Sequence, residues 1–152
     1  MLALTASPAW AADAWVDWRS DDFGFQMTIP PKMKMTAAAL GEWGCMRGEL
    51  PPVQLAGLAK LNSFPELPAM QAFAIAQLGI PAAAWTLLDQ AENQRGWKWF
   101  KTYRAVNKGR FVYALLGHGP RGAYVVYLST TPANRALFNA AYVKWYESLT
   151  VF

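Results

Sequence analysis

The chain has 152 residues, of which 54% are apolar and 16% are charged, and its formal net charge at pH 7 is +4. Such an apolar composition excludes an intrinsically disordered chain, and the length suits one domain with a single core. The most apolar region, residues 69–85, is interrupted by glutamine, glycine and proline, whereas a membrane-spanning helix needs about 20 consecutive apolar residues.

The first eleven residues resemble an export signal more than a fold element. A short apolar stretch leads to Ala9-Trp10-Ala11, the small-x-small pattern at which a signal peptidase cleaves. The basic segment that normally precedes such a stretch is missing, so we interpret residues 1–11 as the remnant of a signal peptide, with a disordered tail as the alternative. The single domain, residues 12–152, is then expected to be periplasmic or secreted.

Residue patterns in the first half predict four strands and a helix. The strands cover residues 15–19, 23–29, 42–48 and 53–61, and the second alternates apolar and polar side chains until Pro30-Pro31 ends it. The helical face comprises four residues: Met70, Phe73, Ala74 and Leu78. Gly79 suits the C-cap, and Ser63 with Glu66 is placed to form a capping box, although Pro68 leaves the start of the helix open.

The second half predicts four more strands and a longer helix. The strands cover residues 85–92, 97–106, 110–117 and 123–130, joined by glycine-containing hairpin turns. Thr131 and Pro132 suit the N-cap and the first helical position. The apolar stripe of this helix comprises Leu137, Ala141, Trp145 and Leu149, widened by Phe138 and Tyr142. The predicted fold class is α+β, a single domain with an antiparallel sheet of about seven or eight strands flanked by two main helices.

The strand over residues 97–106 carries apolar side chains on both faces, which predicts a sheet covered on both sides. Strict alternation divides its residues into two sets: Trp97, Trp99, Lys101, Tyr103 and Ala105 on one face, and Lys98, Phe100, Thr102, Arg104 and Val106 on the other. The basic side chains are then expected to reach past the core to its margin.

The order of these elements, with "FGFQMTIPPKM" near the start and "YVKWYESL" at the end, resembles the PsbP-like fold. That fold includes the extrinsic photosystem II subunit, a nuclear Ran-release factor and bacterial DcrB-like envelope proteins. The resemblance spans nearly the whole mature chain, and it implies binding or assembly roles rather than catalysis. No site motif of the family is visible here, so none of its functional residues is transferred.

Catalytic signals are weak. "GHGPRG" at residues 117–122 matches the dinucleotide glycine pattern, but a predicted strand follows it where that mechanism requires a helix, so we interpret it as a hairpin loop. Cys45 and His118 could form a nucleophilic dyad, although Cys45 lies in a predicted strand and is better interpreted as a core thiol. Two carboxylate pairs suit glycoside hydrolysis by type: Asp21 with Asp22, and Asp89 with Glu92. One histidine and one cysteine are too few for a usual zinc site, so we predict no cofactor, metal or catalytic residue.

Charge is distributed unevenly along the chain. Residues 1–92 contain nine acidic and five basic residues, whereas residues 95–144 contain nine basic residues and no acid. From this imbalance we predict a surface for an anionic partner, formed by Lys98, Lys101, Arg104, Lys108, Arg110 and Arg121. The alternative is a solvated rim that only raises the isoelectric point. Export argues against nucleic acid and for phospholipid headgroups, an acidic polymer or an acidic protein.

Together these patterns predict an exported, non-enzymatic envelope protein that binds or assists a partner. The alternative is a carbohydrate or cell-wall binding module, because eight Trp residues could supply stacking rings. That alternative requires at least two Trp rings that are more than half exposed on one face. A small hydrolase is the third candidate.

Overall fold

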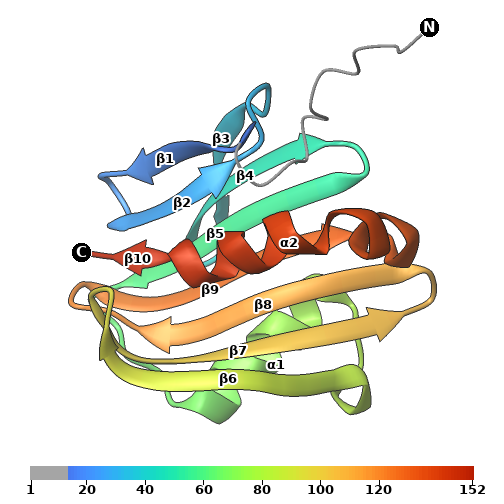
Figure 1. Ribbon diagram of the computed structural model, residues 1–152. Coiled ribbons are helices and arrows are strands. Elements are labelled where there is room, and N and C mark those ends of the chain that lie inside the picture. Colours follow the sequence, from blue (N-terminus) through green and yellow to red (C-terminus); the bar gives the residue numbers. More distant parts are fainter. Residues whose placement is uncertain (1–13) are drawn as a thin grey trace, which may run out of the picture.

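The computed structural model describes residues 14–152, so the predicted signal peptide and its cleavage site lie outside the described part (Figure 1). The described elements, in chain order, are β1 (Val16–Ser20), β2 (Phe25–Ile29), β3 (Met35–Leu40), β4 (Trp43–Leu50), β5 (Val53–Leu61), α1 (Leu67–Leu78), the short 3-10 helix η2 (Ala82–Ala84), β6 (Trp85–Gln94), β7 (Trp97–Asn107), β8 (Arg110–His118), β9 (Gly122–Thr130), α2 (Pro132–Ser148) and β10 (Thr150–Val151).

The strands form two antiparallel sheets in one α+β domain, which confirms the predicted fold class. The main sheet has seven strands in the order β3-β4-β5-β9-β8-β7-β6, and the smaller one has the order β1-β2-β10. In Figure 1, α2 crosses the front of the main sheet and α1 lies behind it. The main sheet is therefore covered on both sides, as the double-sided apolar pattern predicts.

The α2 side of the main sheet is closed by large side chains. The small sheet and α2 pack there, and Trp97, Tyr124, Tyr142 and Trp145 are each at most 2% exposed. Burial of each such aromatic removes about 150–250 Å² from water, so this cluster contributes strongly to stability.

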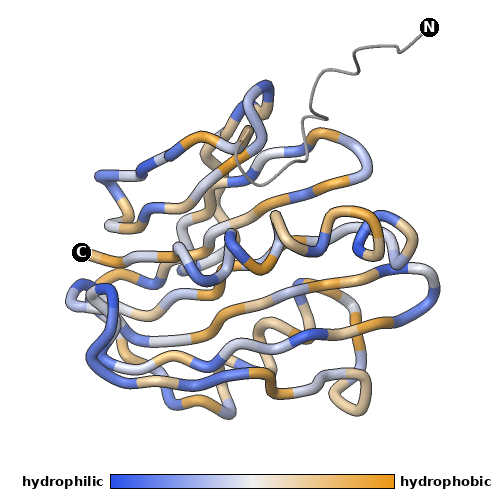
Figure 2. The backbone as a smooth tube through the Cα atoms, viewed as in Figure 1, coloured by the Kyte–Doolittle hydropathy of each residue, from blue (hydrophilic) through white to orange (hydrophobic). Residues whose placement is uncertain are grey.

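The α1 side is closed by smaller residues. Its buried cluster contains five alanines, and α1 contributes Met70, Ala74 and Leu78 to it. Cys45 is buried in this cluster, as predicted for a core thiol. Figure 2 shows that hydrophilic residues gather at the hairpin turns, while hydrophobic residues are frequent along the central strands.

All eight predicted strands are present, and the described residues contain two more. β3 was not predicted because its sequence, "MTAAAL", is dominated by alanines, which are poor strand formers, and because it lies exposed at the sheet edge. β10 was not predicted because it has only two residues, which pair with Gln26 and Phe25 of β2.

The helix ends confirm two predictions and correct two others. Gly79 adopts a left-handed φ of 67° and donates to the Ile75 carbonyl, and Thr131 accepts from the Asn134 N–H at the start of α2. The predicted capping box is wrong, because Glu66 is itself the N-cap residue and its side chain makes no cap bond. The predicted stripe is wrong at Leu137, which is 75% exposed.

The prediction for Leu137 is wrong because of a local kink in α2. Phe138 has non-helical backbone angles (φ −123°, ψ 21°), so the helix is kinked there. Phe138 packs against the core cluster that contains the fully buried Trp145, whereas the preceding residue faces solvent. The stripe therefore begins at Phe138 and continues through Ala141, Trp145 and Leu149.

Candidate functional site

The six predicted basic residues occupy separate places in the fold. Lys98 and Lys101 lie in the first half of β7, and Arg104 lies exposed in its second half. Lys108 is exposed in the β7–β8 turn at the opposite end of the sheet. Of the six, only Lys98 and Lys101 share the same half of one strand.

Arg110 and Arg121 are engaged within the protein. Arg110 donates to the Leu78 carbonyl at the end of α1 at 2.6 Å and to the Ser129 hydroxyl at 2.7 Å. Arg121 donates to the backbone carbonyls of Asp21 and Asp22 at 2.7 and 2.8 Å. Both guanidinium groups hold separate parts of the chain together, which is a structural use of their charge.

A cluster that we name the cationic patch surrounds the start of β7. It consists of Phe64, Lys98, Trp99, Lys101 and His118. The Lys98 Nζ atom lies 4.5 Å from the centroid of the Phe64 ring, within the range of a cation–π contact. Phe64 is 46% exposed, so this contact faces solvent.

Two aromatic rings of the patch contact the His118 ring at an angle. The His118 ring lies 5.5 Å from the Phe64 ring and 4.7 Å from the Trp99 ring, measured between centroids. Its Nε2 atom is 2.6 Å from the Pro65 carbonyl oxygen, so this nitrogen donates. The histidine therefore anchors the loop before α1 to the end of β8.

Lys101 is the second lysine of the patch. Its Nζ donates to the Gln90 Oε1 atom of β6 at 2.7 Å, which holds the ammonium group at the strand edge. Two ion pairs occur within residues 14–152, Arg19 with Asp21 and Lys60 with Glu42, and neither involves the patch. Its positive charges are thus not neutralised by an ion pair in the described part of the chain.

The start of β7 departs from the predicted alternation. Trp97 packs into the α2-side core, where its Nε1–H donates to the Leu149 carbonyl at 3.0 Å, whereas Trp99 packs on the α1 side. The prediction that Trp97 shares a face with Trp99 is therefore wrong. As a consequence Lys98 reaches Phe64 beside α1, instead of sharing the opposite face with Phe100.

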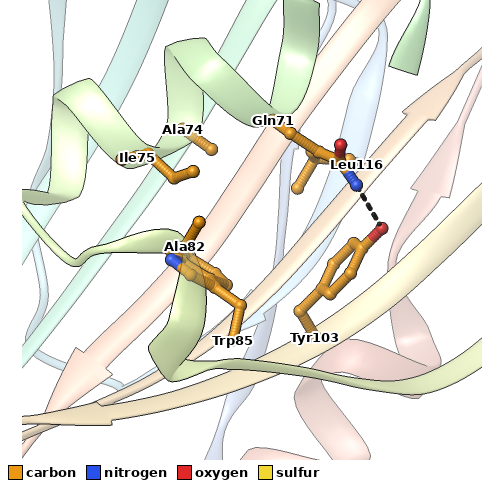
Figure 3. A pocket seen from close by; sticks show the side chains of 7 residues that line it. All are labelled: Gln71, Ala74, Ile75, Ala82, Trp85, Tyr103 and Leu116. Atoms are coloured by element: carbon orange, nitrogen blue, oxygen red, sulfur yellow. Dashed lines mark hydrogen bonds between the residues drawn. The ribbon is translucent and has the colours of Figure 1, made fainter. Parts of the chain in front are cut away.

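A cavity of about 210 Å³ lies on the same side of the sheet, between α1, η2 and strands β6 to β8. Figure 3 shows its lining side chains: Gln71, Ala74, Ile75, Ala82, Trp85, Tyr103 and Leu116. None of the seven side chains carries a charge, and Tyr103 is the single titratable group among them.

Comparison with known proteins gives a structural match and no sequence match. No protein-family profile and no curated protein sequence matches the chain. The solution structure of cyanobacterial PsbP (CyanoP) from Synechocystis sp. PCC 6803 covers 98% of this chain and 99% of its own, with a TM-score of 0.62 and 12% sequence identity. The chain has a PsbP-like fold. This confirms the resemblance that the element order indicates, and at this identity the match establishes the fold alone.

Within this PsbP-like fold, Cys45 and His118 do not meet. They lie on β4 and β8, which are separated by β5 and β9, so their backbones are at least about 14 Å apart at a strand spacing of about 4.8 Å. The dyad hypothesis is therefore wrong. The "GHGPRG" segment joins β8 to β9 as a hairpin loop, as predicted, with the Gly119 N–H donating to the Gly122 carbonyl.

The two carboxylate pairs lie on solvated surfaces. Asp21 and Asp22 are exposed in the β1–β2 turn, where Asp21 pairs with Arg19 at 2.6 Å. Asp89 and Glu92 are exposed on the edge strand β6. Residues 14–152 contain no group of three or more His, Cys, Asp or Glu side chains placed to hold a metal ion, and no helix long and apolar enough to cross a membrane.

The Trp residues do not form the surface that the carbohydrate hypothesis requires. In the described part of the chain each Trp is buried or intermediate in exposure, and none is more than half exposed. With Trp10 outside the described residues, the criterion of two exposed rings on one face is not met. The carbohydrate alternative is therefore wrong by its own test.

Sequence patterns missed Phe64 and the cavity. Phe64 stands alone between polar and proline residues in "NSFPELP", and an isolated aromatic in such a loop is the signal that could have found it. The cavity depends on where the link between α1 and β6 places Ala82, and no local pattern determines that position.

Proposed function

We propose that this protein is an exported, non-enzymatic accessory protein of the cell envelope that binds an acidic protein through the cationic patch. The observation that carries the proposal is the pairing of Lys98 with the exposed Phe64 ring, next to Trp99 and Lys101. Charge steers an anionic partner toward such a surface, and exposed aromatic area supplies contact energy once it arrives.

The charge distribution supports an anionic partner. Residues 93–146 contain no acidic side chain, and four of the five patch residues belong to this segment, Phe64 being the exception. Two acids lie near the patch along the sequence, Glu66 two residues after Phe64 and Glu92 six residues before Lys98, and neither forms an ion pair with either lysine in the described residues. The attraction to an acidic surface is therefore retained at low salt and screened at high salt.

The shape of the patch favours a protein over an extended polymer. Phe64 and Trp99 provide an aromatic centre and the lysines a charged rim, which is the usual composition of a protein–protein interface. The PsbP-like fold adds support, because the resemblance implies roles in binding or assembly. We therefore infer that the partner is a protein with an acidic surface.

The matched pair of variants K98Q/K101Q and K32Q/K34Q tests the proposal. Each removes two lysine charges, and Lys32 and Lys34 are exposed in the loop before β3. The tagged proteins are incubated with detergent-solubilised envelope from cells that make the protein, and retained proteins are quantified by mass spectrometry at low and high salt. We expect an acidic protein to be retained by the wild type and K32Q/K34Q, and to be lost with K98Q/K101Q and at high salt.

Two results would contradict the proposal. Equal retention by both variants would show that the patch does not bind the partner. Binding to vesicles that contain an anionic phospholipid, lost in K98Q/K101Q and absent with neutral vesicles, would replace the acidic protein with a lipid surface.

A further inference from the structure

The cavity beside α1 has walls that are fixed before any ligand enters. The Trp85 indole Nε1–H donates to the Ile80 carbonyl at 3.1 Å, which sets the orientation of that ring. The Gln71 Nε2–H donates to the Tyr103 hydroxyl at 3.1 Å, shown as the dashed line in Figure 3. The Trp85 and Tyr103 rings lie 6.2 Å apart and nearly perpendicular, at 84°. Such a preformed site loses little entropy on binding.

Small side chains explain why the space exists. α1 ends at Leu78, Gly79 turns the chain, and the buried Ile80 leads it into η2. Ala74 on α1 and Ala82 on η2 then face the cavity with single methyl groups, where longer side chains would fill it (Figure 3). The opposite wall is made by Leu116 of β8 and the two rings.

The size of the cavity suits a monocyclic molecule. A cavity of about 150 Å³ in another protein holds benzene, and the cavity here is about 210 Å³. The additional volume corresponds to a small substituent on the ring. Perpendicular aromatic walls favour an aromatic guest, because rings pair edge to face.

The polar end of the cavity determines the chemistry of that substituent. The Tyr103 hydroxyl accepts a hydrogen bond from Gln71 and keeps its own hydrogen to donate. The seven lining side chains include no charged group, so a charged ligand would lose its hydration without a counter-charge. We propose that this cavity binds a small neutral aromatic molecule that carries a hydrogen-bond-accepting oxygen.

Three probes test the ligand class on the full chain: acetophenone, which is neutral with an acceptor; toluene, which lacks the acceptor; and benzoate, which is charged. Binding is followed by saturation-transfer NMR and by the shift of the Trp85 indole N–H signal, assigned with the variant W85F. We expect acetophenone to bind most tightly, toluene less tightly, and benzoate least tightly.

Variants of two neighbouring alanines test whether the ligand binds in this cavity. A82F fills the cavity from η2, whereas A83F adds the same ring at the next residue, which does not line it. We expect A82F to abolish acetophenone binding and A83F to retain it. Both alanines are exposed, and circular dichroism checks that both variants fold.

The variant Y103F tests the hydrogen bond. We expect it to weaken acetophenone binding roughly fivefold, the usual effect of one neutral hydrogen bond, and to leave toluene binding unchanged. The proposal is overturned if no probe binds up to its solubility limit, if A82F and A83F bind acetophenone equally, or if benzoate or toluene binds as tightly as acetophenone. None of these readouts involves the envelope partner, so the cavity proposal and the cationic-patch proposal are tested independently.

Discussion

The two faces of the main sheet differ in how completely they are covered. On the α2 side, a helix of 17 residues and a second sheet press large side chains together, among them the fully buried Trp145 and Tyr142. On the α1 side, a helix of 12 residues covers a cluster rich in alanine, and a cavity and a half-exposed ring remain at its margin. The first face buries the larger aromatic side chains, and both proposed binding sites lie on the second.

Similar residues have different uses within this fold. Trp97 at the start of β7 is 2% exposed and hydrogen-bonded to the end of α2, whereas Trp99, two residues later, contacts the His118 ring in the cationic patch. Arg110 is tied to the end of α1, while Arg104 on the preceding strand is exposed. The contacts that each side chain makes, rather than its residue type, therefore separate structural from exposed side chains.

The largest expected effect comes from the closed face. The variant W145A should lower the free energy of unfolding by about 3–5 kcal/mol, because it removes a fully buried aromatic ring. L137A, on the same helix but 75% exposed, should change it by less than about 0.5 kcal/mol. Urea denaturation of the two variants measures the difference, and similar losses would show that α2 does not dock through Trp145.

A smaller difference is expected between two arginines of the β7–β8 hairpin. R110Q should cost about 2 kcal/mol of unfolding free energy, since it removes the charged donor from the Leu78 carbonyl and the Ser129 hydroxyl. R104Q should cost less than about 0.5 kcal/mol, because Arg104 is exposed. Equal costs in thermal or urea unfolding would remove the distinction between structural and available basic residues.

The smallest expected effect concerns alkaline pH. Burial on the α2 side raises the pKa of Tyr142 above its ordinary value of 10.0. The unfolded chain therefore loses this proton first, so its contribution to stability is complete below pH 10 and declines as the pH rises toward the folded-state pKa. Each such tyrosine contributes a slope of at most about 1.4 kcal/mol per pH unit.

The variant Y142F should therefore show a shallower loss of stability above pH 10 than the wild type. Urea denaturation at a series of alkaline pH values gives the two slopes. The comparison uses the slope alone, because the variant also loses the bond from the Asn134 amide at every pH. Parallel curves would mean that Tyr142 is not protected from ionisation by the fold.

Local sequence patterns predicted the strands and the helix ends better than the candidate sites. Apolar runs located β8 and β9, whose residues are buried on both faces, while the hydroxyl of Thr131 and the left-handed backbone of Gly79 marked helix ends. These features depend on neighbours within a few residues. The kink at Phe138 escaped prediction, because nothing in the periodicity of the helix marks it.

The candidate sites depend on contacts between distant segments, which explains why the sequence predicted them only in part. Lys98 and Lys101 were predicted from charge, but Phe64, the aromatic partner of Lys98, lies more than thirty residues earlier in the chain. Arg110 and Arg121 were grouped with them by composition, and only the packed structure shows their bonds to remote backbone carbonyls. The cavity similarly requires α1, η2 and three strands to be assembled first.

A photo-crosslinking amino acid placed at Phe64 or at Ala140 tests most directly whether the open face is the binding face. Phe64 is exposed in the cationic patch on the α1 side, and Ala140 is exposed on the outer surface of α2. In cells that make the protein, irradiation should yield a defined adduct with an envelope protein from position 64 and none from position 140. An adduct from position 140 alone, equal adducts from both positions, or none from position 64 would contradict the account.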